Sequence, residues 1–248
     1  MSMPGMFCGI GVGPGEPGLI PVIAWEFLKR CDVIFVPRAT TMDHSVARQC
    51  LPANEIPDER FREVEFTMDS DRDLLCEHYA TLAETIAAEL RAGKDIAYLT
   101  LGDPFTYSTY TYTLAALKNC LPELRRRTYP GVTSYCAVAA ATEFPLGEGK
   151  QHVLILPCPD KLPELRAAIE SHDIVVLMKI GKRLPAVLAL LQEMGIAANC
   201  AFARHVGMDD EVVHSSVHHM EPERSLGYLA TMLIRKSPAK KRHAGVQS

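Results

Sequence analysis

The chain has 248 residues, which suits one large domain or two modest ones. Its 26 Lys and Arg against 30 Asp and Glu give a net charge of −4, which leaves no net basic field for nucleic acid. We see no signal peptide and no apolar run of about 18 residues, so we expect a cytoplasmic protein without a membrane span. The eight cysteines have no C-x-x-C spacing, which predicts reduced, mostly buried thiols and no protein-bound metal.

Short apolar runs alternate with amphipathic segments in the first half, which predicts an α/β fold with a mainly parallel sheet. The long predicted helix 69–91 carries His78 near helical spacing with five apolar residues, so we interpret His78 as a packed core histidine. The predicted strands are 6–12, 33–36, 62–66 and 96–101, and the predicted helices are 20–31, 69–91 and 107–119, with 40–51 partly helical.

The pattern breaks near residues 118–126, which we take as the junction between two domains, 1–120 and 121–236. The last residues, 237–248, are rich in Lys and Ala and are expected to be disordered. In the second domain the predicted helices are 136–142, 161–171 and 184–194; the predicted strands are 152–156, 173–178, 200–203, 229–235 and an antiparallel 211–214. We therefore expect a mixed sheet there.

The loop after the first strand, Gly13-Pro14-Gly15-Glu16-Pro17-Gly18, fits the letters of G-x-G-x-x-G. Pro14 and Pro17 remove amide donors that a pyrophosphate needs, and Pro37-Arg38 stands where the acidic ribose partner would be. A dehydrogenase is therefore disfavoured. A rigid Gly/Pro turn that approaches another ligand fits better.

A second loop, Gly102-Asp103-Pro104, follows the buried strand 96–101. In open α/β sheets ligands bind beyond the carboxyl ends of strands, so this loop is a candidate ligand floor. The alternative is an ordinary strand-to-helix turn in which Asp103 is a cap. A third loop ends at Thr133 and Ser134, either of which is placed to cap an Ala-rich helix.

These loops resemble the tetrapyrrole (corrin/porphyrin) methylases in their order and spacing over residues 6 to about 235. Four segments carry the resemblance: Gly11-Val12-Gly13-Pro14-Gly15, Gly102-Asp103-Pro104-Phe105, Pro130-Gly131-Val132-Thr133-Ser134 and Val176-Leu177-Met178. Within that family the chain looks most like the C-20 methyltransferases of cobalamin synthesis, through Gly102–Thr109, the segment 69–91 and Glu143-Phe144-Pro145-Leu146.

The resemblance implies two α/β domains with a ligand cleft between them, S-adenosylmethionine (SAM) as cofactor with S-adenosylhomocysteine as product, and a homodimer. Residues 1–120 would form the tetrapyrrole side, and 121–236 would bind SAM together with the Gly102-Asp103-Pro104 loop. Ala203-Arg204-His205 departs from the Glu-Arg or Glu-Asn of the family. The implied SAM contacts are Pro14, Leu101, Gly102, Asp103, Thr106, Thr133, Ser134, Met178, Ala203 and His205, and for Met178 core packing is the alternative.

The resemblance also implies the chemistry. C-20 of precorrin-2 is an electron-rich meso carbon, so the main task is to position it and exclude water. Proton loss could use Tyr107, Tyr110, Tyr112 or His205, which the sequence does not rank. Arg38, Arg48 and Arg204 are candidate partners for substrate carboxylates, with a surface role as the alternative. Other hypotheses are a family methylase for another ring carbon, for ribosomal RNA or for a modified histidine, or a non-catalytic SAM- or tetrapyrrole-binding protein.

Overall fold

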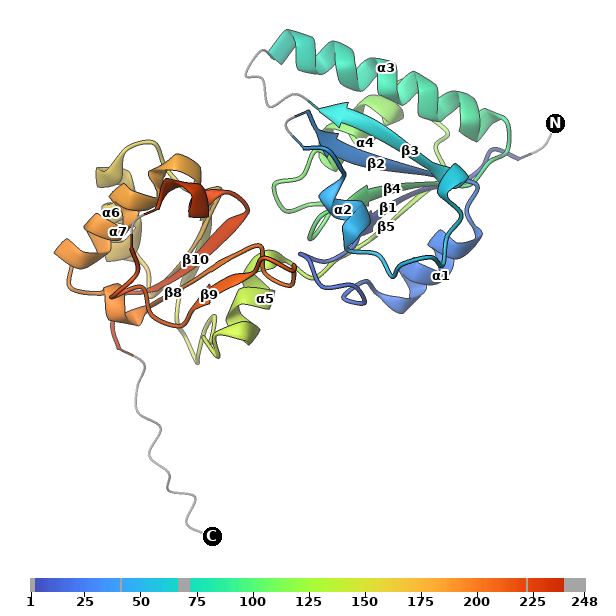
Figure 1. Cartoon of the computed structure of the whole chain (residues 1–248). Helices are drawn as coiled ribbons and strands as arrows, with labels where there is room; N and C mark the ends of the chain where they lie inside the picture. Colours follow the sequence, from blue (N-terminus) through green and yellow to red (C-terminus); the bar gives the residue numbers. More distant parts are fainter. Residues whose placement is uncertain (1–2, 41, 67–71, 222, 239–248) are drawn as a thin grey trace. The chain divides into compact units, whose positions relative to one another are not determined.

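The computed structural model describes residues 3–40, 42–66, 72–221 and 223–238 (Figure 1). The chain divides into two compact units, Met1–Thr133 and Ser134–Ser248, and each has its own five-stranded sheet. The boundary comes later than the predicted junction at 118–126. The reason is strand β5, Arg126–Tyr129, which pairs with β1 in the first sheet and so belongs to the first unit.

The first sheet is entirely parallel, as predicted, with the order β3-β2-β4-β1-β5. Its central strand β1 lies between β4 and β5, so Gly11 pairs with Thr100 and Ile10 pairs with Tyr129. The carboxyl ends of these three strands therefore lie side by side. The strands are β1 Phe7–Gly11, β2 Val33–Ala39, β3 Phe61–Phe66, β4 Ile96–Thr100 and β5 Arg126–Tyr129.

Helices cover both faces of this sheet (Figure 1). Helix α1, Val22–Arg30, and the short α2, Val46–Gln49, pack on one apolar face; α3, Arg72–Arg91, and α4, Tyr110–Cys120, pack on the other. The predicted burial of His78 is wrong. Its neighbour Tyr79 turns into the core, while His78 is exposed. The ring of His78 lies against the edge of the sheet, with its centroid 4.9 Å from that of Phe66.

The second sheet is mixed, with the order β6-β7-β10-β8-β9. Only β6 and β7 are parallel, and the predicted antiparallel strand near 211–214 is confirmed as β9. Helices α6, Leu162–Ser171, and α7, Leu184–Glu193, pack on one face, and α5, Ser134–Ala141, packs on the other. The strands are β6 Val153–Pro157, β7 Ile174–Met178, β8 Cys200–Arg204, β9 Val212–His214 and β10 Ala230–Arg235.

Most cysteines are buried, as their positions in apolar segments predict. Burial raises the pKa of four thiols to about 12, which keeps them protonated at neutral pH. These four are Cys8, Cys31, Cys50 and Cys200, whereas Cys76 and Cys136 are exposed. Among the described residues no helix is long and apolar enough to cross a bilayer, and no group of three metal-binding side chains occurs.

Candidate functional site

Three loops of the first unit meet at the carboxyl edge of its sheet through backbone contacts between glycines. Gly102 donates its N–H to the carbonyl of Gly13 at 2.8 Å, which joins the loops after β4 and β1. A Cβ on Gly131 would lie 2.0 Å from the Gly102 carbonyl oxygen, and one on Gly11 would lie 2.5 Å from that oxygen. Gly102 itself has φ +70, which a glycine adopts without strain. Only glycine at these positions lets the three loops close on one another.

Asp103 ties the same loops together with its carboxylate. Oδ1 accepts the N–H of Phe105 at 2.9 Å and the hydroxyl of Thr106 at 3.3 Å, which shapes the turn into α4. Oδ2 accepts the N–H of Gly131 at 3.2 Å, from the loop after β5. The alternative in which Asp103 caps a turn thus describes two of its three bonds, and the third links two loops. A carboxylate offers about four lone pairs, so one acceptor position of Asp103 stays available to a ligand.

Two buried hydroxyls at this edge have no hydrogen-bond partner among the described residues. They are Thr100 Oγ1, at the end of β4, and Thr133 Oγ1, after β5. Leaving a buried polar group unpaired costs about 1–3 kcal/mol, so such groups commonly mark a place where a ligand or water binds. Thr133 is among the predicted contacts. Thr100 is not, although a polar residue that ends an otherwise apolar strand is a signal the sequence offers.

The remaining candidate residues of the first unit differ in burial and in hydrogen bonding. Pro14 is buried in the first loop, and Leu101 and Thr106 are half-buried in the second. Tyr110 is fully buried, and its hydroxyl lies 2.6 Å from that of Thr128. Burial also raises the pKa of Tyr110, which removes it from the groups able to accept a proton. Tyr107 and Tyr112 are exposed.

The predicted contacts of the second unit lie around the end of β7, the end of β8 and the start of β10, which the antiparallel register brings to one edge. Thr231 of β10 pairs with Met178 and with Ala203. Its hydroxyl is 2.9 Å from that of Ser134, the first residue of α5. Met178 is half-buried against the α5 cluster, and Ala203 is buried in it. Packing in this apolar cluster therefore explains the positions of both side chains.

His205 follows β8 at this edge and has a left-handed backbone, with φ +50. Its Nδ1 lies 2.8 Å from Asp210 Oδ1, and Arg204 Nη2 donates to Asp210 Oδ2 at 3.1 Å. His205 Nε2 and Arg204 Nε are buried without a partner in the described part of the chain. The sequence predicts His205 and Arg204 as site residues but gives no indication of Asp210.

The two other candidate arginines are held by carboxylates. Arg38 contacts Glu63 at 3.0 Å, contacts Glu65, and donates to the carbonyl of Met42. Arg48 contacts Asp58 at 2.6 Å and lies over the ring of Phe61, 4.2 Å from its centroid. Arg48 and Asp58 also line a pocket of about 450 Å³ near α2. Within the described residues, each of these arginines already has an anionic partner.

Known proteins are similar to this chain in sequence and in fold. A sequence model of the family described as tetrapyrrole (corrin/porphyrin) methylases matches residues 6–219. Cobalt-precorrin-2 C(20)-methyltransferase of Salmonella typhimurium is 29% identical over 234 residues, 94% of this chain and 98% of the relative. Precorrin-2 C(20)-methyltransferase of Sinorhizobium sp is 28% identical over 198 residues, 77% and 80% of the two chains.

The fold is that of the solved cobalt precorrin-4 methyltransferase CbiF, with a TM-score of 0.69 at 20% identity over 94% of this chain and 96% of that one. The predicted pair of α/β domains, one with a parallel and one with a mixed sheet, is thus confirmed. Since the family model spans most of the chain, the protein belongs to the tetrapyrrole (corrin/porphyrin) methylases and is a methyltransferase.

Proposed function

We propose that this protein transfers a methyl group from SAM to C-20 of precorrin-2, or of its cobalt form, in cobalamin synthesis. The observation that carries the proposal is the near end-to-end match to the Salmonella protein, whose name specifies that carbon. The Sinorhizobium relative, whose name lacks cobalt, specifies the same carbon. We propose that the protein acts in the cytoplasm as a homodimer.

The loops of the first unit fit a ligand such as SAM, which supplies an activated methyl group on a sulfonium when it is bound. The hydroxyls of Thr100 and Thr133 are buried and unpaired among the described residues, and the Asp103 carboxylate retains one acceptor position. Hydroxyl and amino groups of a ligand would satisfy all three. We propose Pro14, Leu101, Gly102, Asp103, Thr106 and Thr133 as cofactor contacts here, with Thr100 added.

In the second unit we propose Ser134, Met178, Ala203 and His205 as further cofactor contacts. The apolar cluster that holds Met178 and Ala203 keeps water away, and His205 follows β8 at the same edge of the sheet. The protein contributes by fixing the reacting groups in line and excluding water, which is worth about 7–11 kcal/mol in well-oriented reactions. Arg38, Arg48 and Arg204 are proposed to exchange a protein carboxylate for one of the substrate.

The test is a direct assay with two substrates. The purified protein is incubated with SAM and either precorrin-2 or its cobalt form, and the product is analysed by mass spectrometry and NMR. We expect the gain of one methyl group at C-20, and the better substrate identifies the physiological form. A methyl group on another carbon would assign the protein to a different reaction of the family. SAM binding without methyl transfer to either substrate would indicate a non-catalytic SAM-binding protein.

A further inference from the structure

The turn that follows β8 is built to hold one imidazole in a fixed orientation. The carbonyl of His205 accepts the N–H of Met208 at 2.9 Å, and the N–H of Gly207 donates to the Glu211 carboxylate. Both oxygens of Asp210 lie close to His205 Nδ1, at 2.8 and 2.9 Å, and the His205 side chain is only 12% exposed. A left-handed backbone on a non-glycine residue costs about 1–3 kcal/mol, and such strain concentrates at functional sites.

The contacts of this imidazole determine which nitrogen carries its proton. The hydrogen bond from His205, with the charge of Arg204, holds the pKa of Asp210 below its usual value, so Asp210 is a carboxylate at neutral pH. A carboxylate only accepts hydrogen bonds, so Nδ1 of the neutral imidazole carries the hydrogen. Nε2 then presents a lone pair, and it is buried without a donor in the described part of the chain. A histidine held in this way by a carboxylate is the usual arrangement of a general base.

The sequence also predicts three tyrosines as candidate proton acceptors, and these differ from His205 in burial and in contacts. Tyr110 is occupied by Thr128 and has a raised pKa, and Tyr112 is exposed with its ring stacked on that of Tyr79, 5.4 Å between centroids. Tyr107 is exposed, whereas the imidazole of His205 is largely buried. The geometry therefore separates His205 from the other three candidates.

We propose that His205 Nε2 accepts the proton that C-20 loses after methylation, and that Asp210 is its positioning residue; this rests on the proposed function. Once C-20 carries both hydrogen and the new methyl group, the macrocycle is cationic. The C–H bond breaks, its electron pair returns to the conjugated ring, and the proton moves to Nε2. The imidazolium that forms faces the Asp210 carboxylate through Nδ1–H.

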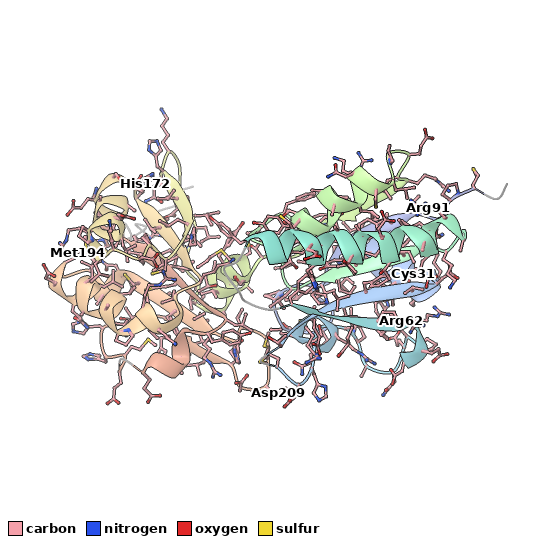
Figure 2. All side chains as sticks on the ribbon, turned by 90° about the horizontal axis from the view of Figure 1, so that it is seen from above. Cys31, Arg62, Arg91, His172, Met194 and Asp209 are labelled. Atoms are coloured by element: carbon pink, nitrogen blue, oxygen red, sulfur yellow. The ribbon has the colours of Figure 1, made fainter. Side chains whose placement is uncertain are left out.

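The kinetic test uses His205→Asn and Asp210→Asn with two matched controls. Asp209→Asn removes the adjacent exposed carboxylate (Figure 2), for which no ion pair occurs among the described side chains. His172→Gln removes an imidazole whose Nδ1 contacts the Ala168 carbonyl instead of a carboxylate. We expect His205→Asn to lower kcat about 100-fold, and Asp210→Asn about tenfold, because its amide can donate to Nδ1 and select the other tautomer.

Substrate deuterated at C-20 distinguishes a role of His205 in removing the proton from a role in positioning the substrate. We expect a primary isotope effect on kcat in both site variants, because breaking the C–H bond becomes limiting. The SAM Kd of Asp210→Asn should stay within about twofold of wild type, because Asp210 is not a proposed cofactor contact. A fall in kcat without that isotope effect, or a weakened SAM Kd in Asp210→Asn with kcat retained, would overturn the proposal. A wild-type protein that leaves C-20 unmethylated would instead refute the proposed function, and the inference with it.

A readout independent of activity is the tautomer in the ligand-free protein. Nitrogen-15 NMR should show His205 protonated at Nδ1 in wild type and in Asp209→Asn, and a mixture of tautomers in Asp210→Asn. If His205 carries its hydrogen on Nε2 in wild type, the lone pair is absent and the proposal fails whatever the kinetics show.

Discussion

Replacing Asp103 by Ala should loosen the loops at the carboxyl edge of the first sheet as well as weaken SAM binding. The change removes an acceptor from Phe105 N–H, the Thr106 hydroxyl and Gly131 N–H. A hydrogen bond to a charged group is worth about 1.5–3 kcal/mol net. Because Asp103 is half-buried and two of its three bonds exceed 3.1 Å, we expect a combined loss of about 3 kcal/mol.

The assay is hydrogen exchange at the Gly131 amide, with thermal unfolding alongside. A loss of about 3 kcal/mol corresponds to exchange about 100-fold faster if local opening limits it. The melting temperature should fall by about 6–12 °C. Asp103→Asn is the more specific variant, since it keeps Oδ1 for Phe105 and Thr106 but sets an amide N–H₂ against the Gly131 N–H. Its loss of free energy should be about half that of Asp103→Ala. Asp209→Asn should change neither quantity.

One outcome would refute the reasoning about Asp103. If Asp103→Ala exchanges at Gly131 as slowly as wild type and melts within about 1 °C of it, the carboxylate does not link the loops. If both variants lose the link but bind SAM within about twofold of wild type, the remaining acceptor position has no role in binding the cofactor.

Three further predictions test the same edge and the core. Gly131→Ala should cost about 3 kcal/mol or more in a denaturant titration, because its Cβ meets backbone at 2.0 Å, whereas Gly147→Ala, 3.3 Å from a Val153 methyl, should change little. Thr133→Val should leave the free energy of unfolding within about 0.5 kcal/mol of wild type and weaken SAM binding about tenfold by calorimetry. Thr142→Val loses a 2.7 Å bond to the Val138 carbonyl, so it should lower the free energy of unfolding and leave SAM binding unchanged. Burial raises the pKa of four thiols from 9.0 to about 12: Cys8, Cys31, Cys50 and Cys200. The stability that each of them contributes is therefore complete below pH 9 and should fall by about 1.4 kcal/mol per pH unit between pH 9 and 12, as measured by urea unfolding of wild type and of the four single Ser variants.

Local sequence determined most of the elements because β1, β2 and β4 are largely apolar runs that stop close to Gly or Pro. Residues 96–101 predicted β4, and the loop after it was a candidate ligand floor. The glycine contacts show that this loop meets two others, but contact between Gly11, Gly102 and Gly131 depends on strand order, which a single sequence does not contain.

What the sequence missed depends on contacts between distant residues or on the exact phase of a helix. β5 has two exposed arginines and an intermediate threonine, so only its pairing with β1 assigns it to the first unit. His78 and Tyr79 differ by one position, and the helix turns Tyr79 inward. Asp210 looks like one more acid in a polar turn, and only its position beside His205 gives it a role.

The place of β10 in the second sheet has a consequence for biosynthesis. This strand lies between β7 and β8 but follows both in the chain, so the centre of the sheet leaves the ribosome after the strands on either side of it. Until then β7 and β8 both expose unpaired edges, which invite pairing with other nascent chains. A stop codon before residue 230 would thus remove the middle of the sheet.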